Sequence, residues 1–336
     1  MKTILKSALL LGAMGCTPGD YWYFRTDGVD LPVRVEGNLD SGVVLLMLHG
    51  GPGGSAVAYN LGLDAERLED AFAVAYYDQR GQGGTHGNYE AAMYTVEQVA
   101  EDNANLVRAL RARYGDDTSV WLYGHSWGGM LGTATLLETD ADVDGWIESA
   151  GSHDYPLNDV YTADRLLAQA DIELDEGTDY PAEWRDIRRE VEDILEDGEI
   201  GDNESLRLNG YATEVEDYLD LKSGPYGEES AIGYLLRNPT NGLTGWWAGI
   251  EGSLRLNESA QTKEYTERLD EITVPSVFLY GDLDFICPME LGQDAYDRVS
   301  TDAKEIHIYE NAGHSLMLSY PNRYADTIID FVNAWR

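Results

Sequence analysis

Short, continuous apolar runs recur along this 336-residue chain, and each leads into a glycine-rich or polar turn. They are short and rich in β-branched and aromatic residues, so they predict buried strands. Between them lie helical patterns; in one, Thr95 is the expected N-cap and Gly115 the expected end. This alternation predicts an α/β fold, a mostly parallel sheet covered by helices on both faces. The predicted strands are residues 42–50, 72–81, 119–126, 145–151, 275–282 and 305–314.

The strand signals stop between His153 and Glu271, where the sequence is acidic and amphipathic in a helical pattern. Two strand signals follow, and two strands alone could not bury themselves as a separate domain. We therefore expect a helical cap, residues 153–271, inserted before the last two strands of a core. That core comprises residues 19–152 and 272–336, and its last 13 residues predict a closing helix.

The first 18 residues read as a targeting segment outside the fold. Lys2 and Lys6 flank an apolar run over residues 8–14, which is too short for a membrane-spanning helix of about 20 residues. Small residues precede Cys16, and this resembles a bacterial lipoprotein signal, although Ala13 stands where leucine is usual. The resemblance implies lipidation of Cys16 and a membrane-anchored protein of a bacterial envelope. An ordinary secretory signal, giving a secreted or periplasmic protein, is the alternative.

The charge of the chain restricts its partners. With 61 acidic and 23 basic residues the net charge is −38, which disfavours nucleic acid and anionic membrane surfaces and attracts cations, including amines. The acidity extends over the whole chain, so adaptation to salt or solubility explains it better than a substrate does. With Cys16 lipidated, Cys287 has no disulfide partner, and the histidines show no metal-ligand spacing. We expect no metal and no cofactor; the oligomeric state is not indicated.

The segment GHSWGG, residues 124–129, follows a predicted strand and precedes a helix. It contains G-x-S-x-G, and in this setting the pattern predicts a nucleophile elbow that exposes the hydroxyl of Ser126. A side chain at either flanking glycine would clash with the neighbouring strand and helix. The sequence therefore predicts Ser126 as a nucleophile at the carboxyl edge of the sheet, beside a helix N-terminus.

A serine hydroxyl needs a base, and the base needs an acid that fixes its tautomer. His314 follows the last predicted strand, and the preceding strand leads into Asp282 and Asp284. The resulting order, Ser, Asp, His, is the one expected for a serine hydrolase on an α/β sheet.

Five segments together resemble the α/β-hydrolase superfamily, in particular its proline iminopeptidase-like branch of serine peptidases. They are HGGPGG (49–54), YYDQRGQGGT (76–85), GHSWGG (124–129), G-x-x-D-x-x-x-P (281–288) and AGH (312–314). The resemblance runs from about residue 20 to the end, apart from the insertion. It implies that the acid of the triad is Asp284, with Asp282 as the fallback.

The glycine-rich segment after the first predicted strand has two interpretations. Gly51-x-Gly53-x-x-Ala56, with Asp78 after the next strand, outlines a dinucleotide-binding loop. The resemblance instead implies that the backbone N–H groups of Gly51 and Trp127 form an oxyanion hole. Pro52 has no N–H, which weakens a phosphate cradle but not an oxyanion loop, and we expect a cis Gly51–Pro52 bond. The distant triad decides for the oxyanion loop.

The neighbouring residues receive supporting roles. We expect His49 to support the loop, His125 and Trp127 to line the acyl pocket, and Arg80 to pair with Asp78 without a catalytic role.

The sequence of the cap does not identify the substrate. Iminopeptidases of this branch hold the free amine of a peptide with cap glutamates, but this cap has no clear Trp-Glu pair; Trp246, Trp247 and Glu251 are only suggestive, and Glu251 is the candidate amine anchor. The hypotheses are an aminopeptidase that releases N-terminal residues from short peptides, a carboxylesterase for small esters, and an inactive surface-binding protein on a hydrolase scaffold. Either enzyme would act on a small molecule or short peptide, with membrane contact only through the lipid anchor.

Overall fold

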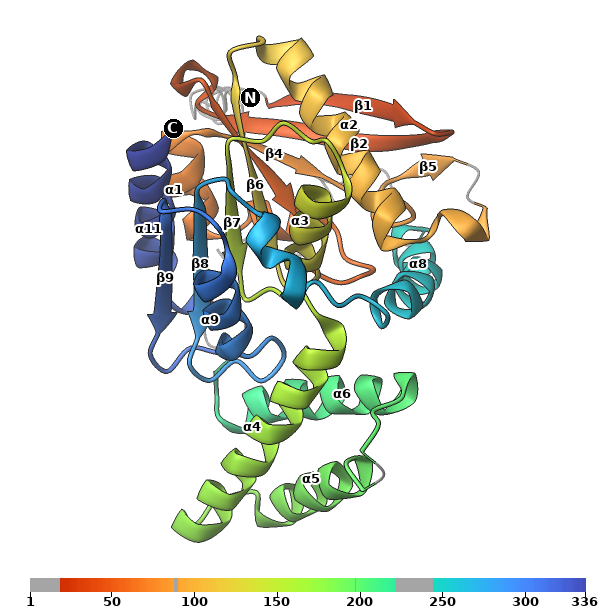
Figure 1. Cartoon of the computed structure of the whole chain (residues 1–336), viewed down its shortest axis with the longest axis vertical. Coiled ribbons are helices and arrows are strands. Elements are labelled where there is room, and N and C mark those ends of the chain that lie inside the picture. The colour runs from red at the N-terminus through yellow and green to blue at the C-terminus, as the bar shows by residue number, and fades with distance from the viewer. Residues whose placement is uncertain (1–18, 88–89, 197, 222–243) are drawn as a thin grey trace, which may run out of the picture.

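The computed structural model describes residues 19–87, 90–196, 198–221 and 244–336, with the backbone alone at residues 91 and 244–251. A nine-stranded sheet forms the centre of the molecule (Figure 1), in the order β1-β2-β4-β3-β6-β7-β8-β9, and β5 pairs with β2. The strands are β1 (Asp20–Thr26), β2 (Val29–Gly37), β3 (Val43–Leu48), β4 (Ala73–Tyr77), β5 (His86–Gly87), β6 (Ser119–His125), β7 (Gly145–Ser149), β8 (Ser276–Gly281) and β9 (Lys304–Tyr309).

All six predicted strands are present, and they form the parallel part of the sheet from β4 to β9. An antiparallel hairpin of β1 and β2, which the sequence analysis did not predict, extends this part at the β4 edge. The sheet is therefore mostly parallel, as expected.

Helices cover both faces of the sheet. The α-helices of the described residues are α1 (Leu63–Ala71), α2 (Val96–Tyr114), α3 (Trp127–Glu138), α4 (Tyr155–Glu176), α5 (Pro181–Ile194), α6 (Asp202–Tyr218), α8 (Thr244–Ala260), α9 (Met289–Arg298), α10 (Leu316–Ser319) and α11 (Pro321–Trp335). Helices α2, α3 and α9 pack on one face, and α1, α10 and α11 pack on the other. In α2 the hydroxyl of Thr95 accepts a hydrogen bond from Gln98 N, and Gly115 caps the end, as predicted.

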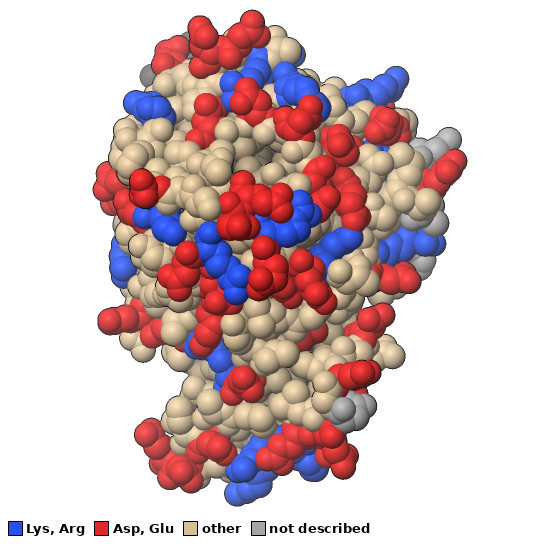
Figure 2. All heavy atoms as spheres, viewed as in Figure 1, with Lys and Arg blue, Asp and Glu red and all other residues tan. Residues whose placement is uncertain are grey.

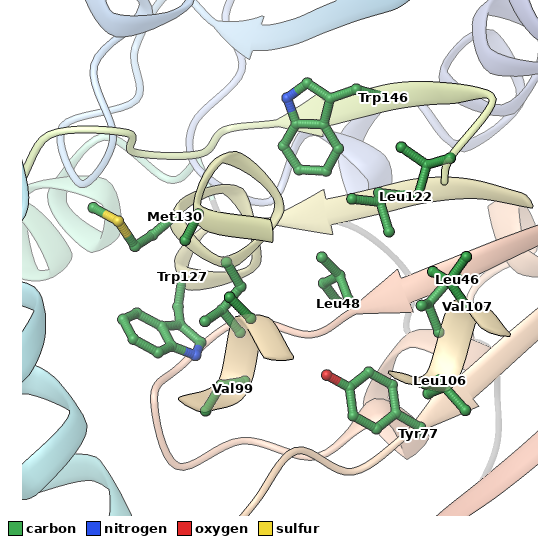
Figure 3. Packing of buried hydrophobic residues seen from close by; sticks show 14 of the residues in the cluster. Leu46, Leu48, Tyr77, Val99, Leu106, Val107, Leu122, Trp127, Met130 and Trp146 are labelled. Carbon is green, nitrogen blue, oxygen red and sulfur yellow. The ribbon is translucent and has the colours of Figure 1, made fainter. Parts of the chain in front are cut away.

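The apolar run of β3 shows why the strand signals are continuous rather than alternating. Leu46 and Leu48 pack against α2 and α3 (Figure 3), and Leu45 and Met47 pack on the opposite face. A strand that is covered on both faces has no side chain exposed to water, so every position is apolar. The observed burial of all six β3 residues agrees with this reasoning.

Between β7 and β8 the described residues contain helices and turns, with one isolated bridge between Asp154 and Glu264. Helix α4 leaves the sheet edge and runs outward, where it packs with α5 and α6 (Figure 1). Trp184, Leu166 and Val215 belong to the apolar cluster of this region, which also includes Phe285 from the loop after β8. The cap therefore shares its core with a loop at the edge of the sheet.

Acidic side chains lie over the whole visible face of the core and the cap (Figure 2). They are not gathered at one place, which agrees with a bias that covers the whole chain. Within the described ranges, no helix is both long enough and apolar enough to cross a membrane. Cys16 and the rest of the expected signal lie outside the described residues.

Candidate active site

Ser126 stands in the turn between β6 and α3, with φ 58° and ψ −123°. A non-glycine residue with positive φ is strained, and here the strain places the serine directly before the N-terminus of α3. A Cβ at Gly124 would overlap the carbonyl of Gly128, and a Cβ at Gly128 would overlap the carbonyl of Leu48. The flanking glycines are therefore required for the close approach of strand, turn and helix, as the sequence analysis expected.

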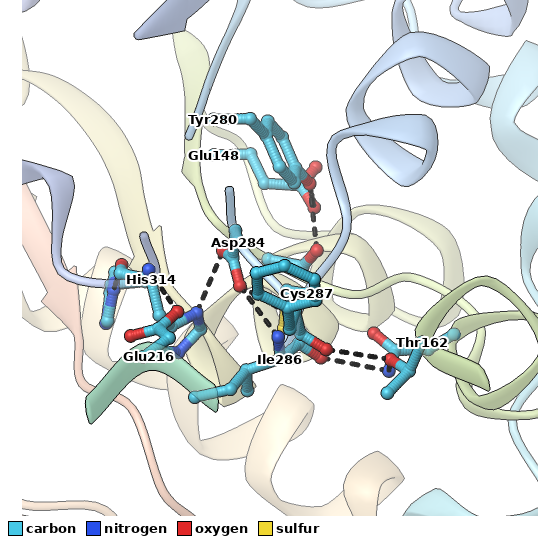
Figure 4. A network of polar contacts seen from close by, with 12 residues as sticks. Glu148, Thr162, Glu216, Tyr280, Asp284, Ile286, Cys287 and His314 are labelled. Atoms are coloured by element: carbon cyan, nitrogen blue, oxygen red, sulfur yellow. Dashed lines mark hydrogen bonds and ion pairs between the residues drawn. The ribbon is translucent and has the colours of Figure 1, made fainter. Parts of the chain in front are cut away.

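The loops after β8 and β9 bring an acid to a histidine. His314 Nδ1 lies 3.0 Å from Asp284 Oδ2 (Figure 4), and the Asp284 side chain is fully buried. Its other oxygen, Oδ1, accepts hydrogen bonds from the backbone N–H groups of Ile286 (2.9 Å) and Cys287 (2.8 Å). These donors fix the carboxylate, so that Oδ2 orients the imidazole ring.

The fallback acid, Asp282, has a different environment. Its Oδ1 accepts a hydrogen bond from Ala312 N at 3.3 Å, and its backbone carbonyl accepts one from Arg165. Among the described residues it has no hydrogen bond or ion pair with His314. The geometry therefore favours Asp284 over Asp282 as the partner of the imidazole.

The histidine ring lies beside the serine turn. The rings of His314 and His125 are 4.8 Å apart, and His125 directly precedes Ser126. Within the described part of the chain, the Ser126 hydroxyl forms no hydrogen bond with His314, and both Ser126 and Cys287 line the cavity. Catalytic hydrogen bonds are often long in unliganded enzymes, so the lack of this bond does not argue against His314 as the base for Ser126.

Four effects act on the pKa of His314. Burial alone would lower it, but the charge of Asp284, the hydrogen bond to that carboxylate and the charge of Glu216 raise the pKa above its usual value. Two carboxylates therefore stabilise the imidazolium form, which is what a general base needs when it takes a proton.

Glu216 was missed by the sequence analysis. It lies on the cap helix α6, is only 3% exposed, and its Oε1 accepts a hydrogen bond of 2.7 Å from His314 N (Figure 4). A Cβ at Gly313 would lie 2.8 Å from the Glu216 carboxyl carbon, so glycine is required for this contact. An acidic residue on an amphipathic helix gives no signal in sequence that it will be buried against a distant loop.

The loop over residues 49–54 lies against the same turn. The Gly51–Pro52 bond is cis, as expected, and Gly51 has φ +141°. A Cβ at Gly51 would lie 2.7 Å from Gly53 N, so no larger residue fits. The backbone N–H groups of Gly51 and Trp127 have no acceptor among the described residues, and both residues line the same cavity as Ser126.

A neighbouring loop, residues 78–84, holds Trp127 and the loop over residues 49–54 in place. Gln79 Oε1 accepts a hydrogen bond from Trp127 Nε1 (2.9 Å), and Gln79 Nε2 donates to His49 O (2.9 Å). Gln82 Oε1 accepts from Gly53 N (2.5 Å). His49 contacts the carbonyl of Gly50 and the backbone N–H of Gln79 through its ring nitrogens, which agrees with its expected supporting role.

Two expectations about nearby side chains were wrong or incomplete. Arg80 pairs with Asp102, at 2.7 Å with both side chains fully buried, and not with Asp78, which instead accepts from Ser55 Oγ at 2.8 Å. Asp102 is seven residues into α2, and only the packing of that helix brings it to Arg80. His125 is not among the residues that line the cavity, whereas Trp127 is.

His125 supports the His314 loop instead. Its ring nitrogens contact Tyr59 Oη (2.8 Å) and His314 O (3.0 Å). Burial and, to a smaller extent, the nearby His314 together lower the pKa of His125 to about 3, so the ring is neutral.

A cavity of about 290 Å³ opens above Ser126, between the core and the cap. Gly51 and Trp127 line it from the core, and Asp159 and Ser205 line it from α4 and α6. Asp159 was not predicted from the sequence. Glu251, the expected amine anchor, and Trp246 and Trp247 have side chains outside the described part of the chain. Within that part, no group of three or more His, Cys, Asp or Glu side chains could hold a metal ion.

A central parallel sheet with a strained serine turn, a paired aspartate and histidine and an inserted set of helices defines a class of hydrolases. The sequence model of the alpha/beta hydrolase family matches residues 45–327. The chain belongs to this family, is a hydrolase, and falls in its proline iminopeptidase-like branch.

Individual proteins resemble this chain in sequence or in fold. A proline iminopeptidase from Saccharolobus solfataricus is 25% identical over 93% of this chain and 91% of its own. The crystal structure of a proline iminopeptidase from Mycobacterium smegmatis is similar in fold, with a TM-score of 0.65, 16% identity and coverage of 94% and 98% of the two chains. An esterase from Exiguobacterium antarcticum has the same fold, with a TM-score of 0.60, 17% identity and coverage of 94% and 99%.

Proposed function

We propose that the chain is a serine hydrolase with Ser126 as nucleophile, His314 as general base and Asp284 as the acid that orients the histidine. The observation that carries the proposal is the strained Ser126 turn, which lines a cavity together with Gly51 and Trp127 and lies beside the His314–Asp284 pair. A serine in that position needs only a base and an oxyanion site to attack a carbonyl.

The proposed reaction has two halves. Ser126 Oγ attacks the scissile carbonyl carbon while His314 takes its proton, and the oxygen of the tetrahedral intermediate accepts hydrogen bonds from Gly51 N and Trp127 N. Each of these donors would lower the barrier by about 3 kcal/mol. His314 then protonates the leaving group, and water, activated by the same histidine, hydrolyses the acyl-enzyme.

The proposed activity is that of an aminopeptidase similar to proline iminopeptidases, which releases N-terminal residues from short peptides. The curated relatives with 25% identity are named proline iminopeptidases, and they support this choice over a carboxylesterase. The same triad would hydrolyse a small ester. The acyl pocket, and not the sheet, therefore decides which of the two substrates is accepted.

The first test is covalent labelling. A fluorophosphonate probe should label the wild-type protein, and Ser126→Ala should abolish labelling while the circular dichroism spectrum stays unchanged. A well-folded wild type that resists the probe would favour an inactive binding protein on this scaffold.

The second test separates the two enzyme activities. The wild type should release naphthylamine from proline naphthylamide, and its rate is compared with the rate on p-nitrophenyl butyrate. Turnover of the ester together with no turnover of any aminoacyl amide would exclude the peptidase and leave the esterase.

We also propose that Cys16 carries a lipid and anchors the exported protein to a bacterial envelope, on the basis of the sequence of residues 1–18 alone. Intact-mass analysis of the protein from membranes should give the mass of a lipid on an N-terminal Cys16. A mature chain that begins at another residue would refute the anchor.

A further inference from the structure

The cavity above Ser126 contains a carboxylate that the proposed chemistry does not use. Asp159 lies in the first turns of α4, where this helix leaves the sheet edge (Figure 1), and its side chain is only 6% exposed. It is the only carboxylate among the described residues that line the cavity, and no lysine or arginine of the described part lines it. Within that part, Asp159 has no ion pair.

The hydrogen bonds around Asp159 leave its carboxylate able to act as an acceptor for a ligand. Gln261 Nε2 donates to Ser205 Oγ (2.8 Å), so the Ser205 hydroxyl can donate its own hydrogen to Asp159 Oδ1 (2.9 Å). A neutral hydroxyl compensates a buried carboxylate only in part, because the charge itself has no partner of opposite sign. The Asp159 side chain therefore has no cationic partner in the described part of the chain, and a ligand could supply one.

The neighbouring residue, Asn158, also lines the cavity and has a second acceptor. Asn158 Nδ2 donates to Ile286 O (3.0 Å) and to Thr162 Oγ1 (3.3 Å), which orients the amide. Its Oδ1 is buried and has no hydrogen-bond partner among the described residues. Asn158 and Asp159 both line the space above Ser126, and between them they have one unpaired acceptor and one uncompensated carboxylate. An ammonium group has donors for both.

We propose that Asp159, with Asn158 beside it, binds the protonated amine of the substrate while the neighbouring carbonyl lies at Ser126. This inference rests on the proposed function, and it assigns substrate selection to α4 rather than to Glu251. The cavity of about 290 Å³ is at the small end of ligand sites, which suits one aminoacyl group.

Two further observations agree with this assignment. Burial raises the pKa of Asp159 to about 7, against the hydrogen bond from Ser205, and a bound cation would bring the pKa down again. Glu216, another buried carboxylate from the cap, is not among the described residues that line the cavity, and it already accepts a hydrogen bond from His314 N.

The test compares Asp159→Asn with Glu251→Gln, and with Asp64→Asn as a matched control, because Asp64 is a buried acid of α1 outside the cavity. The first readout is the protection of Ser126 from a fluorophosphonate by prolinamide, which has a free amine, and by N-acetylprolinamide, which has none. The second readout is the KM for proline naphthylamide, with p-nitrophenyl butyrate as the amine-free substrate.

In Asp159→Asn, protection by prolinamide should weaken by about tenfold or more, the size of effect expected for the loss of a charge-assisted hydrogen bond. The KM for proline naphthylamide should rise equally, and labelling and ester turnover should stay within about twofold. Asp64→Asn should resemble the wild type. Unchanged protection in Asp159→Asn, or a loss confined to Glu251→Gln, would overturn the proposal.

The protection assay needs only a reactive Ser126, so it tests Asp159 even if the wild type cleaves no aminoacyl amide and the peptidase proposal fails. Should Asp159→Asn not fold, Ser205→Ala removes the donor that orients the carboxylate. Ser205→Ala should weaken protection by prolinamide while labelling without prolinamide is unchanged, and undiminished protection would count against Asp159.

Discussion

The Glu216 carboxylate of the cap helix α6 accepts a hydrogen bond of 2.7 Å from the backbone N–H of His314. This contact joins the inserted helices to the loop that carries the proposed general base. Because Glu216 is nearly fully buried there, its charge acts on the imidazole with little screening by water. The cap therefore takes part in setting the basicity of His314, in addition to covering the cavity.

Glu216→Gln should extend activity to lower pH. The amide oxygen of glutamine can still accept from His314 N, so the loop stays in place while the negative charge is removed. The pKa of His314 is raised partly by that charge, and His314 must be neutral to act as a base. The acid limb of the pH profile of kcat/KM should therefore move down in pH.

The matched control is Glu214→Gln on the exposed face of the same helix, and it should leave the pH profile unchanged. Glu216→Ala, which removes the acceptor as well as the charge, should lower kcat in addition to moving the acid limb. A profile for Glu216→Gln that coincides with the wild type would contradict the electrostatic role.

Asp284→Asn should lower kcat by roughly 10⁴-fold, because an amide can hold the imidazole in the wrong tautomer. Asp282→Asn should cost less than about tenfold, since Asp282 contacts Ala312 N and not the ring. Steady-state kinetics on the preferred substrate measure both. Equal losses in the two variants, or a larger loss in Asp282→Asn, would show that Asp284 is not the acid of the triad.

Asp102→Asn should destabilise the fold by about 3–5 kcal/mol, because it leaves the charge of Arg80 buried without a partner. Thermal unfolding followed by circular dichroism should show a lower Tm. The control is Asp30→Asn in the exposed Arg25–Asp30 pair, where no change in Tm is expected. An Asp102→Asn variant as stable as the wild type would show that Arg80 finds compensation elsewhere.

Salt should stabilise the protein. With a net charge of −38, repulsion between acidic side chains opposes the compact state, and the Debye length falls from about 10 Å at ~0.1 M salt to about 3 Å at ~1 M. The Tm should rise with sodium chloride and should rise less with sucrose of the same osmolality. A Tm that is flat or falling with salt would show that repulsion is already balanced by the arginine ion pairs.

The parallel strands and the proposed triad could be predicted because their signals are local. Each strand is a short apolar run, and the glycines around Ser126 are required by contacts within a few residues of the turn and with the adjacent strand. The hairpin of β1 and β2 also has a local signal, the Asp27-Gly28 dipeptide, and both residues have positive φ, as a two-residue Asp-Gly turn requires.

The sequence by itself determined the six parallel strands, and it predicted an insertion before the last two of them and Ser126, Asp284 and His314 as candidates at strand ends. Only the tertiary structure decided which carboxylate meets which partner. Arg80 pairs with Asp102, Glu216 contacts His314, and Asp159 enters the cavity of Ser126. The physical reason is that propensity and periodicity depend on neighbours along the chain, whereas the burial and charge of an acid on a helix depend on the surfaces that packing brings against it.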